Sequence, residues 1–262
     1  MGLKVFGDES TDETRSRAFA VAGVVGRENE WKAAEEEWLH RTGGAIFHAA
    51  DCEHSGNLEL YKDLTQIIAR SRLAARAVSV DLIVFRELFP DTSTAGVYYL
   101  CFVALVYWLV ENAASKLDEA IEFTFDNRAD SGYNASRFYE EMARKRGWAA
   151  RRFMHERLEF SRRENPRIQM ADLFARECMK DLDSKIGPRK RPPRKSIIAL
   201  QGKINLRVLD RKYFEGVHIL ATRLEGKHLA NYIAWLSRKR RTDNASNRIE
   251  YIAFLEARGK SI

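Results

Sequence analysis

Leu3-Lys4-Val5-Phe6-Gly7-Asp8 is an apolar run that ends in a carboxylate. Its composition predicts a buried strand, and the apolar residues 18–25 predict a second one. The segment from Glu9 to Arg17 between them is short and polar, so the two strands are expected to form a hairpin. The fold should therefore contain an antiparallel portion.

Strands and helices alternate through the next part of the chain. The apolar spacing predicts helices over 28–41, 57–72, 96–115, 135–147 and 167–182, and strands over 77–85, 120–126 and near 157–161. Strands that alternate with helices favour parallel pairing in the second half. The predicted fold class is α/β, with a mixed sheet flanked by helices.

The composition changes at about residue 184. Gly187-Pro188 and Pro192-Pro193 stand among six basic residues and cannot continue a helix. Residues 184–196 are predicted to be a mobile basic connector, followed by a strand or short helix after 203 and by helices over 226–241 and about 246–258. We expect an α/β domain over 1–183, with a helical insertion at about 27–75, and a basic, mainly helical extension over 184–262.

The bulk composition restricts the classes of protein to consider. Its three cysteines are scattered, so neither a disulfide framework nor a zinc knuckle is indicated, and a reducing cytoplasm fits. The longest apolar run, Val97 to Val110, has about 14 residues against roughly 20 needed to span a bilayer. We expect a cytoplasmic protein without a membrane segment.

Net charge points to a polyanionic partner. The formal net charge is +7 and the pI is about 9.3, which suits DNA or RNA. The residues predicted to hold phosphates are Arg128, Lys190, Arg191, Arg194 and Lys195. A solvated basic linker is the alternative interpretation of the same charges, and Arg238-Lys239-Arg240-Arg241 form a second basic cluster.

Three aspartates lie where a charge is costly. Asp8 and Asp126 end predicted strands, and both should reach the carboxyl edge of the sheet if those strands are parallel neighbours. Asp172 lies on the apolar stripe of its predicted helix, where a charge must be paired or metal-bound. Carboxylates gathered at one edge repel one another, and a divalent cation removes that repulsion. Asp8, Asp126 and Asp172 are therefore the candidate catalytic ligands of Mg²⁺ or Mn²⁺.

Each aspartate also has a structural explanation. Asp8 and Asp126 each precede polar residues and are compatible with turns or caps. Asp172 is one helical turn before Arg176, so a buried ion pair is an alternative to metal binding.

The segment from His48 to His54 adds a second group of candidate residues. His48 and Asp51 are predicted as accessory catalytic residues, because a histidine can orient a water or protonate a leaving group. Zinc binding by His48, Asp51 and His54 is an alternative, although the spacing matches no strong zinc signature. A polar surface loop, with Asp51 capping the next helix, is the structural alternative.

Several short motifs in this order resemble the DUF3800 family of bacterial and phage proteins, which is grouped with the ribonuclease H-like superfamily. They are Asp8-Glu9-Ser10, Ala22-Gly23-Val24-Val25, Phe47-His48 with Asp51, Asp126-Asn127-Arg128 and Ile168-Gln169-Met170-Ala171-Asp172-Leu173. The resemblance covers residues 3–182, about 70% of the chain. It implies a five-stranded sheet with three antiparallel strands followed by two parallel ones, and acids at Asp8, Asp126 and Asp172.

The chain departs from ribonuclease H proper at one point. That enzyme carries a glutamate near the start of the helix after the third strand, where this chain has Thr94-Ala95-Gly96-Val97-Tyr98, and Glu111 comes too late. One metal therefore fits better than two, and the segment with His48 and Asp51 is predicted to supply the missing function.

The leading hypothesis is a divalent-metal-dependent nuclease that hydrolyses phosphodiester bonds in DNA or RNA, in phage defence or mobile-element biology. Two alternatives remain open. The same fold can bind nucleic acid without catalysis, or the acids can be structural and the protein a subunit that binds a protein partner or forms a homo-oligomer.

Overall fold

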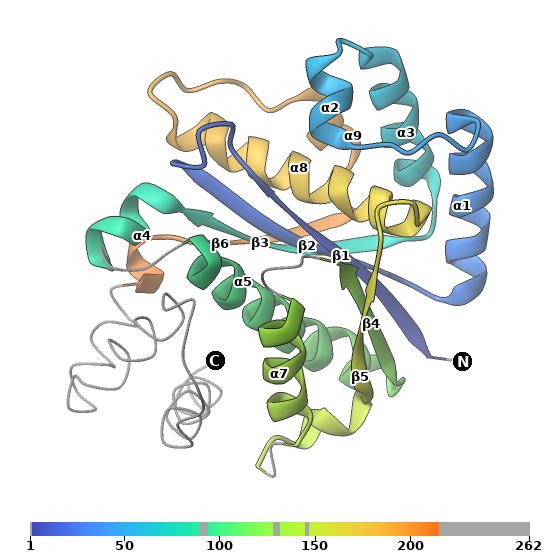
Figure 1. Ribbon diagram of the computed structural model, residues 1–262, viewed down its shortest axis with the longest axis vertical. Coiled ribbons are helices and arrows are strands. Elements are labelled where there is room, and N and C mark those ends of the chain that lie inside the picture. Colours follow the sequence, from blue (N-terminus) through green and yellow to red (C-terminus); the bar gives the residue numbers. More distant parts are fainter. Residues whose placement is uncertain (1, 90–93, 128–131, 145–146, 215–262) are drawn as a thin grey trace.

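A mixed sheet of six strands forms the centre of the computed structural model, which describes residues 2–89, 94–127, 132–144 and 147–214 (Figure 1). The strand order is β5-β4-β1-β2-β3-β6. Strand β2 is antiparallel to both of its neighbours, β1 and β3, whereas β4 is parallel to β1, β5 to β4 and β6 to β3. Their bounds are Leu3–Thr11 (β1), Ala18–Gly26 (β2), Ala74–Asp81 (β3), Ile121–Asp126 (β4), Met154–Ser161 (β5) and Ile204–Leu209 (β6). The α/β class and the opening hairpin are confirmed.

The expectation of five strands is wrong by one. Strand β6 comes from the region after 184 and pairs with β3, with the Ala75 N–H donating to the Lys203 carbonyl at 2.7 Å. Ile204 and Leu206 of β6 pack against the buried core next to it. The strand covers the backbone edge of β3, which would otherwise expose unpaired N–H and C=O groups.

Helices cover both faces of the sheet (Figure 1). One face carries α1 (Glu28–Thr42), α2 (Ala49–His54), α3 (Leu58–Arg70), α8 (Pro166–Ile186) and α9 (Lys195–Ala199). The other carries α4 (Leu82–Leu88), α5 (Thr94–Leu109) and α7 (Gly132–Ala143). The remaining elements are a π-helical turn, η1 (Val110–Ala114), then α6 (Ser115–Leu117) and a 3₁₀ turn, η2 (Ala149–Phe153).

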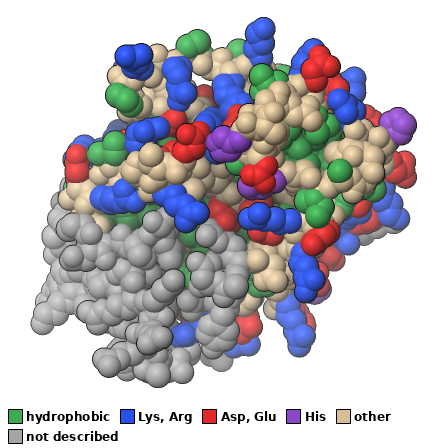
Figure 2. All heavy atoms as spheres, turned by 45° about the horizontal axis from the view of Figure 1, so that its top comes forward, with side chains coloured by type: hydrophobic (Ala, Val, Ile, Leu, Met, Phe, Trp, Pro, Cys, Tyr) green, Lys and Arg blue, Asp and Glu red, His purple; other side chains and the backbone are tan. Residues whose placement is uncertain are grey.

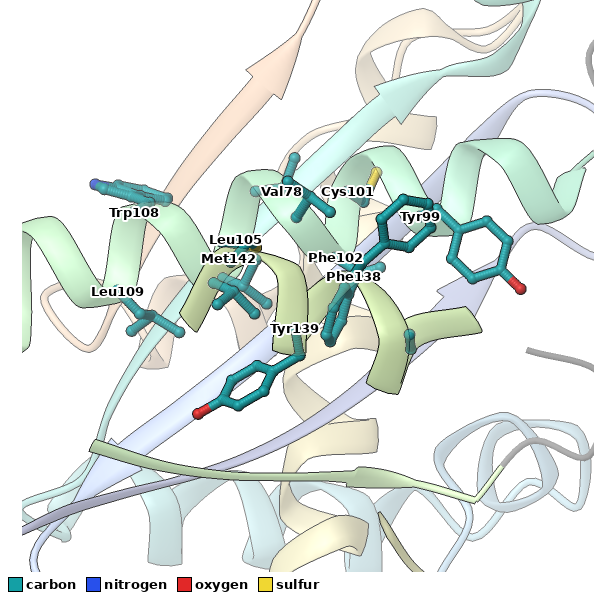
Figure 3. Packing of buried hydrophobic residues seen from close by; sticks show 14 of the residues in the cluster. Val78, Tyr99, Cys101, Phe102, Leu105, Trp108, Leu109, Phe138, Tyr139 and Met142 are labelled. Carbon is teal, nitrogen blue, oxygen red and sulfur yellow. The ribbon is translucent and has the colours of Figure 1, made fainter. Parts of the chain in front are cut away.

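Aromatic and aliphatic side chains fill the space between α5, α7 and the sheet (Figure 3). The Phe102 ring meets Phe125 of β4 edge to face at 5.0 Å between centroids, and Tyr139 of α7 meets Phe123 at 5.6 Å. The helical stretch Gly96–Leu117 is long and apolar enough to cross a membrane by length and composition, and 65% of that window is buried against the rest of the protein. Such burial is that of a core helix.

Two predicted boundaries are wrong. Strand β3 ends at Asp81 instead of continuing to 85, because the Asp81 carboxylate accepts from the N–H groups of Ile83 (2.9 Å) and Val84 (3.2 Å) and starts helix α4. The segment after His48 is not a loop but helix α2, and Asn57 rather than Asp51 caps the helix that follows it. The predicted helices over 226–241 and 246–258 lie outside the described residues, as do Arg128 and the basic cluster 238–241.

Candidate functional site

The pairing of β1 with β4 brings two of the three aspartates together. Gly7 of β1 is the register partner of Phe125 on β4, so Asp8 and Asp126 are the next residues on two parallel neighbours. A Cβ atom at Gly7 would overlap the Phe125 ring, so this close approach requires glycine.

Both carboxylates face helix α8. Side chains alternate between the two faces of a strand. Asp8 shares its face with Phe6, which packs in the core under α8, while Phe125, next to Asp126, packs in the core under α5. The exposed fraction is 7% for Asp8 and 8% for Asp126. The two carboxylates are therefore close together and recessed.

Helix α8 supplies the third aspartate. It packs across β1 and β2, and Asp172 on it is 5% exposed. The Ala49 N–H at the start of α2 donates to Asp172 Oδ2 at 2.7 Å. The alternative pairing of Asp172 with Arg176 is not formed, because Arg176 instead donates to Glu53 of α2, with 2.8 Å between Nε and Oε2.

Burial raises the pKa of two of the aspartates, Asp8 and Asp172. The pKa of Asp8 lies well above its usual value, first because the group is buried and then because of the negative charges of Glu9, Asp172 and Asp126. Burial also raises the pKa of Asp172, and nearby His48 and the Ala49 N–H offset part of that effect. In the described part of the chain no lysine or arginine forms an ion pair with Asp8 or Asp172. The cluster therefore carries negative charge that a cation would neutralise.

The donor atoms of the cluster do not yet converge. Within the described ranges no group of three or more Asp, Glu, His or Cys side chains is arranged closely enough to hold a metal ion. One oxygen of Asp8 accepts the Glu9 N–H at 2.7 Å, and one of Asp172 accepts the Ala49 N–H. The set has the chemistry of a Mg²⁺ or Mn²⁺ site, since all three members are recessed carboxylates. Side-chain rotation would be needed to bring three oxygens onto one ion.

His48 lies between this cluster and Asp51. Its Nε2 atom is 3.9 Å from Asp172 Oδ2, and its Nδ1 atom is 2.9 Å from Asp51 Oδ2. The second contact has the distance but not the angles of a hydrogen bond, so we treat it as electrostatic. The structure thus brings together four of the five predicted catalytic residues, while Asp51 is 80% exposed in its side chain and reaches the site only through His48.

A cleft of about 820 Å³ lies over the carboxylates. It is bounded by the end of β1, the β1–β2 hairpin, the start of α2, the β5–α8 turn and α8, and Asp126 and Asp172 are in its lining. Figure 2 shows this side of the molecule, where histidine and acidic side chains adjoin one another and lysine and arginine side chains surround them. A second cleft of about 470 Å³ between α7 and β5 contains none of the predicted site residues.

Most of the predicted phosphate-binding residues lie away from this cleft. Arg191 pairs with Asp183 at 2.6 Å, whereas Lys190 and Lys195 are exposed on the connector and at the start of α9. Arg194 pairs with Glu53 and, at 3.3 Å, with Glu177, which is completely buried. The segment between α8 and α9, predicted to be mobile, is therefore fastened to the domain by ion pairs.

Two features of the site were absent from the sequence-based prediction. Glu9 follows Asp8 directly and is the first of the charges that raise the pKa of Asp8. Arg163 lies in the β5–α8 turn, with its Nε atom 3.9 Å from Asp126 Oδ2. The adjacent pair Arg162-Arg163 between a predicted strand and a predicted helix was the available signal.

No protein-family model matches this chain, and a search of curated proteins finds no match.

Proposed function

We propose that the protein is a divalent-metal-dependent nuclease that hydrolyses phosphodiester bonds in DNA or RNA. One observation carries the proposal: β1, β4 and α8 deliver three recessed carboxylates to one sheet edge, where burial, Glu9 and the other two carboxylates raise the pKa of Asp8. A purely structural role would favour a neutral or ion-paired residue at Asp8 and Asp172, because unneutralised buried charge is costly and, among the described residues, neither pairs with a lysine or arginine.

Asp8, Asp126 and Asp172 would hold Mg²⁺ or Mn²⁺. When bound, such an ion supplies charge neutralisation at the phosphate and lowers the pKa of a water. The carboxylates orient the reacting groups at the floor of the cleft, where the low exposure of all three limits solvent.

His48 would hold or deliver a proton. Its Nε2 atom faces the carboxylate cluster at 3.9 Å from Asp172, while Asp51 lies beside Nδ1. A carboxylate on one ring nitrogen favours the proton there, which leaves the other nitrogen to exchange a proton with water or a leaving oxygen.

The arrangement of strands supports a relationship to the ribonuclease H-like superfamily and to the DUF3800 family. Three antiparallel strands are followed by two parallel ones, and the acids lie on β1, on β4 and on the long helix after β5. On this proposal the sixth strand is an addition to the shared sheet. A cytoplasmic location and a role in phage defence or mobile-element biology belong to the same hypothesis.

The experiment is a cleavage assay on single-stranded DNA, duplex DNA and RNA with Mg²⁺ or Mn²⁺. We expect products that disappear in EDTA and fall by at least about 100-fold in Asp126→Asn, since even partners outside the first ligand shell contribute about 10–100-fold. The matched control is Asp63→Asn, because Asp63 lies on α3 with its side chain 46% exposed and, within the described part of the chain, forms an ion pair only with Arg41. Full activity in Asp126→Asn, or in EDTA, would refute the proposal.

Nucleic-acid binding without catalysis is the second candidate. The observation that favours it is that the three carboxylates do not converge on one point in the described structure. It predicts binding that survives EDTA, together with no products on any of the three substrates.

A further inference from the structure

Three arginines stand on the rim of the cleft that contains the aspartates. Arg15 is at the tip of the β1–β2 hairpin, and Arg162 and Arg163 are in the turn between β5 and α8. All three are exposed, and all three line the same cleft as Asp126 and Asp172. They come from two segments far apart in the sequence, so the fold alone brings them to one opening.

The backbone under each arginine is fixed. In the hairpin, one Asp12 oxygen accepts the N–H groups of Ser16 (3.0 Å), Arg17 (2.8 Å) and Ala18 (3.0 Å). The carbonyl of Arg15 itself accepts from the Arg86 guanidinium at 2.9 Å. These bonds hold the hairpin tip in place while the Arg15 side chain projects from it.

The β5–α8 turn is held in a similar way. Asn165 caps α8 by accepting the Arg167 N–H at 3.0 Å, and its amide donates to Ser161 at 3.0 Å. The Gln169 amide donates to the Arg163 carbonyl at 2.9 Å. Both arginines of the turn are therefore presented by a backbone whose conformation is set before any ligand arrives.

The rim charges are available to a ligand. Among the described residues, no carboxylate forms an ion pair with Arg15 or Arg162, and Arg163 approaches only Asp126, at 3.9 Å. The other cations near the cleft are engaged, since Arg176 binds Glu53 and Lys180 lies 3.4 Å from Glu13. In the described residues, Arg15 and Arg162 are therefore unpaired cations on a rim that also carries the exposed acids Glu13 and Glu164, and Arg163 is paired only at 3.9 Å.

The depth of the carboxylates restricts what can reach them. They are 5–8% exposed beneath the rim, in a cleft of about 820 Å³, which is the size of sites that enclose a small ligand. Bending a duplex site of 20–30 base pairs by 40–90° costs about 1–6 kcal/mol, so bringing one phosphate of duplex DNA into such a recess is costly. A flexible single strand avoids this cost.

Among its described lining residues, the cleft has no exposed Phe, Tyr or Trp ring for bases to stack on. Phe19 is 2% exposed and belongs to the core, and the two histidines of the lining lie beside carboxylates, His48 beside Asp172 and His54 beside Glu13. Recognition of bases in single strands relies on stacking against aromatic rings. The available contacts are to phosphates, which carry no sequence information.

We propose that Arg15, Arg162 and Arg163 form a phosphate-binding rim that receives single-stranded nucleic acid without sequence selection. The proposal rests on the proposed function only in identifying the aspartates below the rim as the place of cleavage. It assigns substrate binding to these three residues and not to the basic connector.

The test is the salt dependence of binding of fluorescent 12-nucleotide strands, measured by anisotropy in EDTA so that no metal-dependent cleavage occurs. Each phosphate contact on a single strand contributes about −0.7 to the slope of log affinity against log salt. Three contacts give about −2, so between 50 and 200 mM salt the wild type should lose roughly 20-fold more affinity than Arg15→Ala/Arg162→Ala/Arg163→Ala. Homopolymers and mixed sequences should bind within a few-fold of one another, and a duplex of the same length should bind at least about 10-fold more weakly.

The matched control is Arg189→Ala/Lys190→Ala/Lys195→Ala, which removes three exposed charges from the connector and α9. It should keep the wild-type slope. An equal loss of slope in both triple variants, duplex binding as tight as single-strand binding, strong sequence dependence, or no binding at 50 mM salt would each overturn the proposal. Binding with these properties but without cleavage in Mn²⁺ would refute the proposed nuclease activity and support the phosphate-binding rim. Cleavage that is unaffected by the triple rim variant would support the nuclease activity and refute the rim.

Discussion

Replacing Asp8 by asparagine should make the protein more stable at neutral pH. The substitution keeps an oxygen that can accept the Glu9 N–H and removes a buried charge that faces Glu9, Asp126 and Asp172. Relief of such repulsion at a functional site typically contributes about 0.5–2 kcal/mol to the free energy of unfolding. For a chain of this size 1 kcal/mol raises Tm by about 2–4 °C, so Tm should rise by roughly 1–8 °C.

The stability gained in Asp8→Asn should depend on pH in a defined direction. Because the pKa of Asp8 is raised in the folded protein, the folded state binds that proton more tightly than the unfolded chain does. The wild type therefore loses stability as pH rises from the usual aspartate value through the raised pKa, and the variant does not. The difference in Tm between the two should vanish near pH 4 and should grow as pH rises through the raised pKa of Asp8.

Divalent metal should make the wild type more stable than Asp8→Asn. At ten times its Kd a ligand that binds only the folded state contributes about 1.4 kcal/mol, so Mn²⁺ should raise the Tm of the wild type by about 3–6 °C. Asp8→Asn should respond much less. Thermal melts of both proteins with Mn²⁺ and with EDTA measure all of these effects.

The neighbouring Asp12 is the control for this experiment. It is also buried, but hydrogen bonds from Thr14 and from the Ala18, Arg17 and Ser16 amides outweigh its burial and lower its pKa. Asp12→Asn should therefore lose about 1.5–3 kcal/mol, as expected when charge-assisted hydrogen bonds are weakened. A destabilised Asp8→Asn, or an unchanged response to Mn²⁺, would refute our account of the acidic cluster.

Three further substitutions test other parts of the structure. Gly7→Ala should cost about 1–3 kcal/mol in urea unfolding, because the new methyl group overlaps the Phe125 ring; equal stability would show that β1 and β4 are not so close. Glu28→Gln should make the free energy of unfolding less dependent on pH in the acid range. The Arg167 hydrogen bond lowers the Glu28 pKa to about 2, so about 1 kcal/mol, discounted for partial exposure, is present above pH 4.5 and lost as pH falls towards 2. His48→Gln should slow cleavage by about 100-fold or more while exposed His40→Gln does not; equal rates would remove His48 from the mechanism.

The strands of the sheet were predictable where their own residues show an apolar pattern. β1, β2 and β4 are apolar runs bounded by turn residues, so their positions follow from the sequence. The adjacency of Asp8 and Asp126 was predicted only on the condition that β1 and β4 are parallel neighbours, which the pairing of the two strands confirms. Strand β6 was harder, because Ile204-Asn205-Leu206-Arg207-Val208-Leu209 is short and its place beside β3 is decided by tertiary contacts. The start of α4 was misread, since Leu82 to Phe85 suits a strand as well as a helix and only the Asp81 cap distinguishes them.

The residues of the candidate site were likewise predictable only in part. Asp172 could be identified because a helix face shows its burial in the sequence. The partners of a long side chain cannot be identified in that way. Arg194 counts as one positive charge in a basic segment, and only the fold shows that Glu53 and Glu177 neutralise it. The rim arginines were overlooked for the converse reason, since two isolated turns show no cluster until the hairpin and the β5–α8 turn meet.

The pairing of β1 with β4 also determines when during folding the acidic cluster can exist. The two strands are separated by more than a hundred residues, whose described part includes six α-helices, a π-helical turn and two other strands, whereas β1 and β2 join through a short hairpin. Contacts between distant segments form late because their closure entropy must be met first. A nascent or partly unfolded chain thus has Asp8 without Asp126 and Asp172, so the proposed hydrolase would be inert towards the cell's own nucleic acids until its fold is complete.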